Sequence, residues 1–94
     1  MFTVQSENQG MIKFVGRLDA SQTAYAESEL AKVQGQVTVD LSGLEYISSA
    51  GLGLFIGLYR RLTSAGGSLV IVGASDHVRH IFRLARLDQL LTFK

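Results

Sequence analysis

The sequence predicts an α/β fold, in which packed helices cover a mixed sheet of four to five strands that contains an N-terminal hairpin and a βαβ unit. Short β-branched and aromatic segments alternate with longer segments whose apolar residues recur every three or four positions. Residues 37–72 have the order strand, helix, strand, which predicts two parallel strands joined by a right-handed crossover. The chain has 94 residues, of which 47% are hydrophobic, so we expect a single domain over residues 1–94 with its own core.

An antiparallel hairpin is predicted at the start of the sequence. Residues 2–5 and 11–16 are β-prone, and the polar stretch 6–10 between them ends in a glycine. Apolar residues alternate with charged ones in the second strand, so one side of this strand should face the core. The residues expected on that side are Ile12, Phe14 and Leu18.

A helix from about residue 22 to residue 34 is predicted next. Asp19 and Ser21 are both plausible N-caps, because their side-chain oxygens can accept hydrogen bonds from the unpaired N–H groups at a helix start. Gly35 fits the end of this helix.

The middle of the chain is predicted to form a strand, a turn and a long helix. The strand covers residues 37–41, and Ser42 with Gly43 is interpreted as a turn. The helix begins near Ser48 and Ser49 and extends to about residue 65.

Three further elements complete the prediction. The continuous apolar run at residues 69–72 is typical of a strand that is central or covered on both faces. Ser75 is the expected N-cap of a last helix over residues 76–85. Residues 90–93 form either a short edge strand or a packed tail.

The long helix has an unusual solvent face. Its core side is expected to carry Leu52, Phe55, Ile56, Tyr59 and Leu62, widened by Leu54 and Leu58. Its opposite side carries Ser49, Gly53, Gly57, Arg60, Arg61 and Ser64. A glycine inside a helix costs about 1 kcal/mol relative to alanine, so two glycines on one face indicate that something approaches the backbone closely. It is either a loop of the same chain or a partner that docks on a strip headed by Ser49.

Most of the chain matches a family pattern, in the stretches DLSGLEYISSAGLGLFIGLYRRL and GGSLVIVGASDHVRHIFRLARLDQLLTF. The chain resembles the STAS domain, named for sulfate transporters and anti-sigma factor antagonists, and above all the stand-alone bacterial antagonists. The family motif is typically Asp-Ser-(Ser/Thr/Ala)-Gly-Leu-Gly, and a partner kinase phosphorylates its first serine. Aligned on residues 51–53, that serine corresponds to Ser49; Ser48 replaces the usual Asp and is the second choice of phospho-acceptor.

The resemblance implies a STAS-type fold and an anti-sigma factor antagonist, a binding module rather than an enzyme. Unphosphorylated protein would sequester an anti-sigma factor that is also an ATP-dependent serine kinase, phosphorylation of Ser49 would break the complex, and a PPM-type phosphatase would reset it. In the family a Gly-x-Leu-Asp loop beside the serine motif contacts the partner, which implies this role for Asp19; a plain N-cap role fits Asp19 equally well. The expected partner-binding residues are Asp19, Ser21, Ser48, Ala50, Gly53, Gly57 and Arg60.

Ser48 and Ser49 compete for the N-cap position. We expect Ser48 to cap the helix, which makes Ser49 the first helical residue and leaves its hydroxyl accessible to modification. A phosphate there should not unfold the domain, because the N–H groups and dipole of a helix start tolerate negative charge.

Other chemistries are disfavoured. His77 and His80, the only histidines, lie on the expected exposed face of the last helix, so neither a hydrolase base nor a metal site is expected. The glycines of the motif lie inside a helix, so we expect no nucleotide or other cofactor. A net charge of +1 without a basic run predicts no nucleic-acid binding, and the longest apolar run is too short for direct membrane insertion. With no cysteine and no signal peptide, we expect a cytoplasmic protein.

Two alternatives keep the same fold. The chain could be the STAS subunit of an ABC-type lipid transporter, although a threonine often stands at the acceptor position in such subunits. It could instead be a partner-switching regulator of biofilm, secretion or motility that acts without a sigma factor. The sequence leaves this last alternative open, because it needs the same surface as an antagonist.

Overall fold

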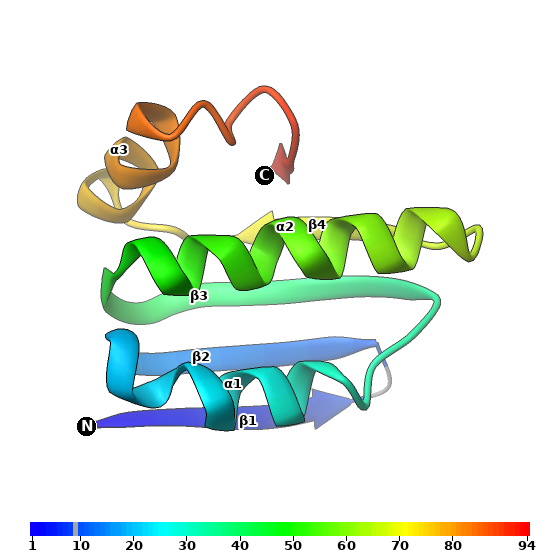
Figure 1. The fold of residues 1–94 in the computed structure, drawn as a ribbon, viewed down its shortest axis with the longest axis horizontal. Coiled ribbons are helices and arrows are strands. Elements are labelled where there is room, and N and C mark those ends of the chain that lie inside the picture. Colours follow the sequence, from blue (N-terminus) through cyan, green and yellow to red (C-terminus); the bar gives the residue numbers. More distant parts are fainter. Residues whose placement is uncertain (9) are drawn as a thin grey trace.

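The computed structural model describes residues 1–8 and 10–94 and has the predicted α/β architecture (Figure 1). Five strands form one mixed sheet in the order β1-β2-β3-β4-β5, in which β1 is antiparallel to β2 and the other neighbours are parallel. The strands are β1 (Phe2–Asn8), β2 (Met11–Leu18), β3 (Gln36–Ile47), β4 (Ser68–Val72) and β5 (Thr92–Phe93). The helices are the 3-10 helix η1 (Ala20–Gln22), α1 (Thr23–Leu30), α2 (Ser49–Ser64) and α3 (Asp76–Leu84).

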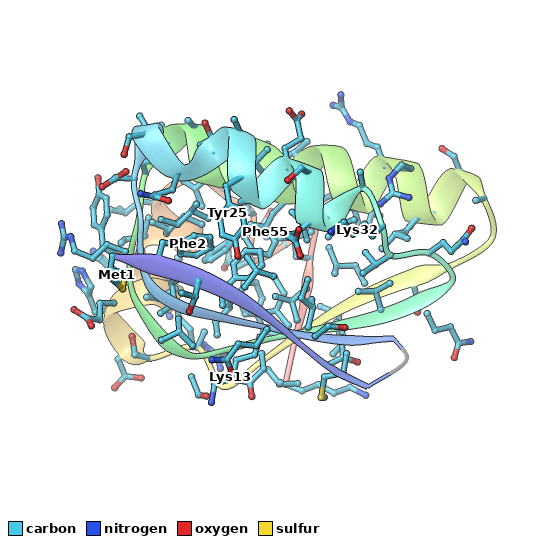
Figure 2. The ribbon with its side chains drawn as sticks, turned by 90° about the horizontal axis from the view of Figure 1, so that it is seen from below. Met1, Phe2, Lys13, Tyr25, Lys32 and Phe55 are labelled. Carbon is cyan, nitrogen blue, oxygen red and sulfur yellow. The ribbon has the colours of Figure 1, made fainter. Side chains whose placement is uncertain are left out.

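The fold has two layers, with the core between the helices and one face of the sheet. Helices α1 and α2 lie side by side over this face, whereas Lys13 of β2 projects from the opposite face (Figure 2). Helix α3 packs beside α2, and the ring centroids of Phe55 and Phe82 are 5.4 Å apart. Along β2, β3 and β4, residues that face the helices are buried, and most of those on the opposite face are only half-buried.

A series of phenylalanine rings joins five elements through this core. The rings of Phe2, Phe14, Phe55, Phe82 and Phe93 contact one another in turn, edge to face, with centroids 5.2–5.7 Å apart. They come from β1, β2, α2, α3 and β5. Each such pair adds about 0.5–1.5 kcal/mol to the stabilisation from burial, so packing of the sheet and of the helices is coupled.

The predicted N-terminal hairpin is confirmed, with both strands longer than expected. Strand β1 continues to Asn8, whose backbone is paired with that of Met11. The predicted connection at residues 6–10 includes Gln9, which lies outside the described residues. The three residues expected on the core side of β2 are buried: Ile12, Phe14 and Leu18.

Strand β3 is also longer than predicted, and the predicted turn at Ser42 and Gly43 is wrong. The strand continues to Ile47 because its register against β2 shifts at two places, each of which takes up one extra residue of β3. Before the first shift, the Asp40 carboxylate accepts a hydrogen bond from the Ser42 N–H at 2.8 Å. A Cβ on Gly43 would lie 3.0 Å from Val15 of β2, so the residues that suggest a turn form a bulge inside a strand.

The predicted helix over residues 22–34 is divided and shorter. The 3-10 helix η1 precedes α1, and α1 ends at Leu30. Beyond it, the N–H of Lys32 bonds to the carbonyl of Glu29, three residues back instead of four. The Leu30 carbonyl accepts a hydrogen bond from the Arg61 guanidinium of α2 at 2.7 Å, so α2 satisfies a group that a longer α1 would have used itself.

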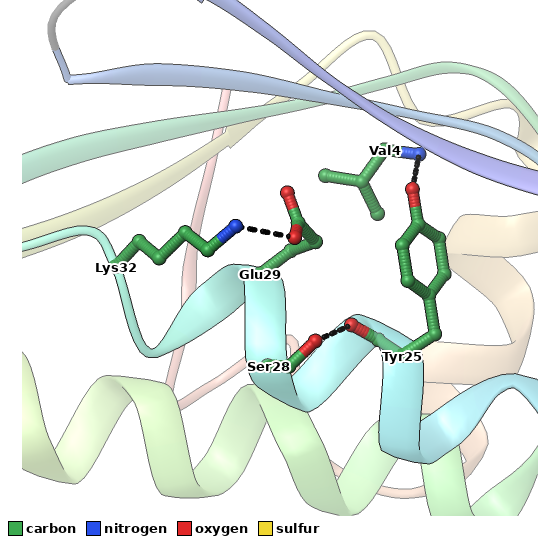
Figure 3. Close-up of polar contacts among 5 residues, drawn as sticks. All are labelled: Val4, Tyr25, Ser28, Glu29 and Lys32. Carbon is green, nitrogen blue, oxygen red and sulfur yellow. Dashed lines mark hydrogen bonds and ion pairs between the residues drawn. The ribbon is translucent and has the colours of Figure 1, made fainter.

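One polar contact joins α1 to the edge of the sheet, and two others lie within α1 and the residues that follow it (Figure 3). The Tyr25 hydroxyl accepts a hydrogen bond from the Val4 N–H of β1 at 3.3 Å, which occupies one unpaired group of this edge strand. The Ser28 hydroxyl donates to the Tyr25 carbonyl at 2.7 Å, and the carboxylate of Glu29 lies 2.7 Å from the Lys32 amine.

The βαβ unit is confirmed, because β3 and β4 are parallel neighbours and α2 connects them. Strand β4 lies between β3 and β5, as expected of a central strand, but it is not covered on both faces. Leu69 and Ile71 are buried, whereas Val70 and Val72 are half-buried on the face without helices.

The C-terminal elements agree with the prediction. Ser75 caps α3, because its hydroxyl oxygen accepts a hydrogen bond from the Val78 N–H at 3.2 Å. Helix α3 ends one residue earlier than predicted, at Leu84. Residues 92–93 form the short edge strand β5, parallel to β4.

Candidate functional site

The candidate site lies where β3 ends and α2 begins. Ser48 has an extended backbone (φ -85°, ψ 170°), and its hydroxyl oxygen accepts a hydrogen bond from the Gly51 N–H at 3.1 Å. This is the geometry of an N-cap, so the prediction that Ser48 caps the helix is confirmed.

Ser49 is the first residue of α2 and is exposed. Because Ser48 supplies the cap, the Ser49 hydroxyl is not needed to hold the helix end. The first turn of α2 contains no acidic residue, so no carboxylate in that turn offsets the positive end of the helix dipole. A negatively charged group on Ser49 would meet unpaired backbone N–H groups at that end.

Asp19 lies in the loop next to the serines. Strands β2 and β3 are parallel neighbours that end in the pair Leu18 and Ile47, and the Ser48 N–H then donates to the Leu18 carbonyl at 2.9 Å. The loops that follow the two strands therefore begin side by side, and Asp19 and Ser48 are the first residues of these loops.

The Asp19 side chain is an N-cap, but of η1 rather than of the α-helix. Its Oδ1 accepts hydrogen bonds from the Ser21 hydroxyl at 2.6 Å and from the Ser21 N–H at 3.1 Å. The bond from the hydroxyl, supported by the N–H, the N-terminal amine and Arg17, lowers the pKa of this carboxyl below its ordinary value. The sequence also allowed Ser21 to be a helix cap, but it is not one in the structure. Its hydroxyl instead donates a hydrogen bond to the Asp19 carboxylate.

The two glycines of α2 border an open groove. Outside the glycine's own stretch of α2, a Cβ on Gly53 or on Gly57 would meet no atom of the described residues within 4 Å, so none of their loops packs on these glycines. The groove lies between α1 and α2 and has a volume of about 310 Å³. Its lining residues are Glu27, Leu30, Ala31, Gly53, Leu54, Gly57, Leu58 and Arg61.

The remaining predicted partner-binding residues lie along the same helix. Ala50 and Arg60 are both exposed, in the first and fourth turns of α2. Arg61, expected on the solvent face, is exposed but reaches across to the end of α1, where its guanidinium bonds to the Leu30 carbonyl. The predicted residues therefore extend from the β2–η1 loop along one side of α2.

Two features of the site were not predicted. Gly51 is buried, and a Cβ there would lie 2.8 Å from Ile47 and 3.0 Å from Leu18, so only glycine lets the helix start sit so close to the sheet. Its place three residues after the capping Ser48 was the available signal. The second feature is the Arg17 guanidinium, stacked 4.7 Å from the ring centre of Tyr46 just before the two loops. No pattern in the sequence indicates this pair.

Neither a metal centre nor a membrane-spanning helix is present among residues 1–8 and 10–94. These residues include no group of three or more His, Cys, Asp or Glu side chains placed to hold a metal ion. Within the same residues, no helix is long and apolar enough to cross a membrane.

Comparisons with known proteins agree with this architecture. The family model described as "Mlab, STAS domain" matches residues 1–92. An anti-sigma-B factor antagonist of Staphylococcus aureus is 31% identical over 84 residues, which are 85% of this chain and 78% of that protein.

Two solved structures have the same fold. The structure of the anti-sigma factor antagonist SpoIIAA in its unphosphorylated form has a TM-score of 0.72 at 17% identity. The match covers 100% of this chain and 87% of the SpoIIAA chain. The Bacillus cell fate determinant SpoIIAA in the phosphorylated form has a TM-score of 0.71 at 18% identity, with 100% and 91% covered. At such identities the likeness shows the shared fold alone. Because the family model matches the hairpin, the serine loop and the βαβ unit together, the chain belongs to the STAS domain family.

Proposed function

We propose that this protein is an anti-sigma factor antagonist whose partner binding is switched by phosphorylation of Ser49. The observation that carries the proposal is the exposed Ser49 at the start of α2, directly after a serine that supplies the cap. The name of the Staphylococcus aureus relative, anti-sigma-B factor antagonist, supports the regulatory role. The role is one of binding in the cytoplasm, and the catalysis belongs to its partners.

The partner is an anti-sigma factor that is also a serine kinase. When Ser49 is unphosphorylated, the partner covers Ser49 and the Asp19 loop and extends along α2 over Gly53 and Gly57. The open space above both glycines supports this docking path, because a partner backbone could approach α2 there without meeting a side chain. Leu54, which lines the groove and is half-buried, would supply apolar contact area.

The switch is a transfer of a phosphoryl group. The kinase moves the γ-phosphoryl group of ATP to the Ser49 oxygen, and ADP and the hydroxyl proton leave. A PPM-type phosphatase later hydrolyses the ester and restores the hydroxyl with release of inorganic phosphate. The phosphate adds about 1.5–2 negative charges at neutral pH, which the helix start tolerates but a closely packed partner surface does not.

The experiment begins with phosphopeptide mapping of the protein recovered from its own cells during growth and stress. We expect phosphate on Ser49, in amounts that differ between the two conditions. Phosphate on Ser48 would move the acceptor by one residue, against the proposal, and a protein that carries no phosphate in either condition would remove the switch.

Binding to the kinase that modifies the protein is then measured with two charge variants. We expect Ser49→Asp to weaken binding by roughly tenfold or more, since a close unpaired charge costs more than about 1.4 kcal/mol. Ser64→Asp is the matched control, because Ser64 is an exposed serine at the other end of the same helix. Equal binding of wild type and Ser49→Asp, or co-purification with a transporter ATPase in place of a kinase, would contradict the proposal.

A further inference from the structure

Helix α3 presents a basic outer face that the serine switch does not use. Residues 76–94 contain four of the nine Lys and Arg residues, namely Arg79, Arg83, Arg86 and Lys94, but only two of the eight acids, Asp76 and Asp88. The apolar side of α3 faces the core through Val78 and Phe82, so its charged side chains point outward. We call Arg79, Arg83 and Arg86 the α3 basic face.

The arginines of this face are available to a partner. Among the residues that the structure describes, the one ion pair is between Lys32 and Glu29, so none of the three guanidinium groups is matched by a carboxylate of the described chain. Arg79 is held over the ring of Phe93, 5.5 Å from its centre. Arg79 and Arg83 line a cavity of about 240 Å³ together with Asp88 and Phe93.

Arg86 occupies a backbone position that normally takes glycine. Helix α3 ends in a Schellman motif, in which the Leu87 N–H bonds to the Phe82 carbonyl and the Arg86 N–H to the Arg83 carbonyl, both at 2.9 Å. Arg86 has a φ of 62°, the one positive φ of a non-glycine residue in the described chain. A non-glycine residue at such a position carries backbone strain, and the exposed Arg86 side chain adds a third guanidinium to this end of the molecule.

An exposed apolar residue lies between Arg83 and Arg86 in the sequence. Leu84, the last residue of α3, is 72% exposed, more than any other large hydrophobic residue among those described except Met1. Leu84 therefore offers apolar contact area at the end of the helix that carries these charges.

We infer that the α3 basic face is a second docking surface, which binds an acidic segment of a protein partner with an apolar side chain beside its carboxylates. All three charges are arginines, whose planar groups form paired hydrogen bonds with a carboxylate. Two arginines and Asp88 line the cavity, so its lining has a net charge of +1. This charge suits one carboxylate better than a polyanion such as a nucleic acid. A membrane is disfavoured because the apolar side of α3 is buried in the core and has no surface left to enter a lipid layer.

The test is an NMR titration with a short synthetic peptide of Glu and Leu, compared with the same peptide carrying Gln in place of Glu. We expect amide shifts confined to residues 76–94, and weaker binding of the Gln peptide. The double variant Arg79→Glu/Arg83→Glu should weaken binding by roughly tenfold or more. The matched control is Lys13→Glu/Lys32→Glu, which makes the same change in net charge on other elements and should leave binding within a few-fold of wild type.

Arg86→Gly separates binding from stability. Glycine fits the positive φ without strain, so we expect a higher Tm for this variant together with weaker peptide binding. Unchanged peptide binding by Arg86→Gly would overturn the assignment of its guanidinium. Shifts spread over the whole surface, or equal loss of binding in the lysine control, would overturn the docking surface.

Two further probes test the other possible occupants of the face. Vesicles of phosphatidylglycerol and phosphatidylcholine, and a short DNA duplex, are titrated in the same buffer. We expect neither to compete with the Glu–Leu peptide. Tighter binding of either one, lost in Arg79→Glu/Arg83→Glu, would assign the face to lipid or nucleic acid and overturn the proposal. None of these measurements depends on phosphate at Ser49, so their failure leaves the proposed switch untouched.

Discussion

Ser48 and Ser49 have the same chemistry but different roles, because α2 begins between them. The Ser48 side chain is committed to the Gly51 N–H, whereas that of Ser49 is exposed on the first helical residue. The preference of serine for the N-cap predicts that one of the two caps α2, and the resemblance to the STAS motif assigns the acceptor position to Ser49. The hydrogen bond from Ser21 to Asp19 could not be predicted, because both residues are plausible caps in the sequence and only the presence of the short η1 helix decides between them.

Asp19 should lose its role as a cap at acid pH. Its pKa is lowered in the folded state, chiefly by the Ser21 hydroxyl, so its contribution to stability is present above the ordinary Asp pKa of about 3.9. That contribution is lost as the pH falls through the lower, folded-state pKa. In an NMR titration of the side-chain carboxyls, we expect Ser21→Ala to raise the pKa of Asp19 toward the ordinary value.

Asp40 is the internal control for this titration. Its pKa is also lowered, but chiefly by the backbone N–H of Ser42, which Ser21→Ala leaves in place. The Asp40 pKa should therefore be the same in both proteins. If the pKa of Asp19 did not respond to Ser21→Ala, the hydroxyl would not be the main cause of its shift.

At the scale of elements, the sequence predicts where strands and helices occur better than where they end. Strand β3 shows why: its buried residues are Val37, Val39, Leu41, Leu44 and Ile47. Their spacing changes from two to three at the bulges, so the alternation that identifies a strand stops although the strand continues. Helix α1 ends early for a reason equally absent from local sequence, since the bond at its end comes from Arg61, thirty-one residues away.

The glycines of α2 should respond to substitution with opposite signs. Gly51→Ala places a Cβ 2.8 Å from Ile47 and 3.0 Å from Leu18, and we expect a loss of about 1–3 kcal/mol in the free energy of unfolding. Gly53→Ala meets no atom within 4 Å and should raise that free energy by roughly 1 kcal/mol, the helix preference of alanine over glycine. Urea unfolding of the two variants measures both values.

The two variants also control for each other, because they make the same chemical change two residues apart in one helix. A loss of stability in Gly53→Ala would mean that the space above this residue is filled by the chain itself. A gain in Gly51→Ala would mean that the helix start can move away from Ile47 and Leu18 without cost.

At the scale of the whole molecule, Ser48 and Ser49 lie at the surface, at the start of a helix that packs on the core. The aromatic series from Phe2 to Phe93 ties β1, β2, α2, α3 and β5 together, and Ser49 is exposed at the start of one of these elements. The α/β fold class and the parallel βαβ unit follow from the order of the segments. The uncovered face of β4 could not be predicted, because an apolar run such as residues 69–72 has the same appearance whether one or both faces of the strand are buried.

Phosphorylation of Ser49 should therefore change the surface and leave the fold in place. A charge at the start of α2 meets unpaired backbone N–H groups and the positive end of the helix dipole, so the helix start can hold it without rearrangement. In NMR spectra of the phosphorylated and unphosphorylated chain, we expect amide shifts limited to residues near the β2–η1 loop and the first turns of α2. The Tm should change by no more than a few degrees, since surface changes shift stability by about 0.5 kcal/mol.

Phe55→Ala provides the contrast for that measurement. Its ring is fully buried and contacts both Phe14 and Phe82, so its removal should cost roughly 3–5 kcal/mol, a large part of the stability of a small domain, and alter shifts in every element of the series. If phosphate on Ser49 produced shifts as widespread as those of Phe55→Ala, the modification would act through the core. A partner would then detect a change of conformation throughout the domain, and not a charge placed at its contact surface.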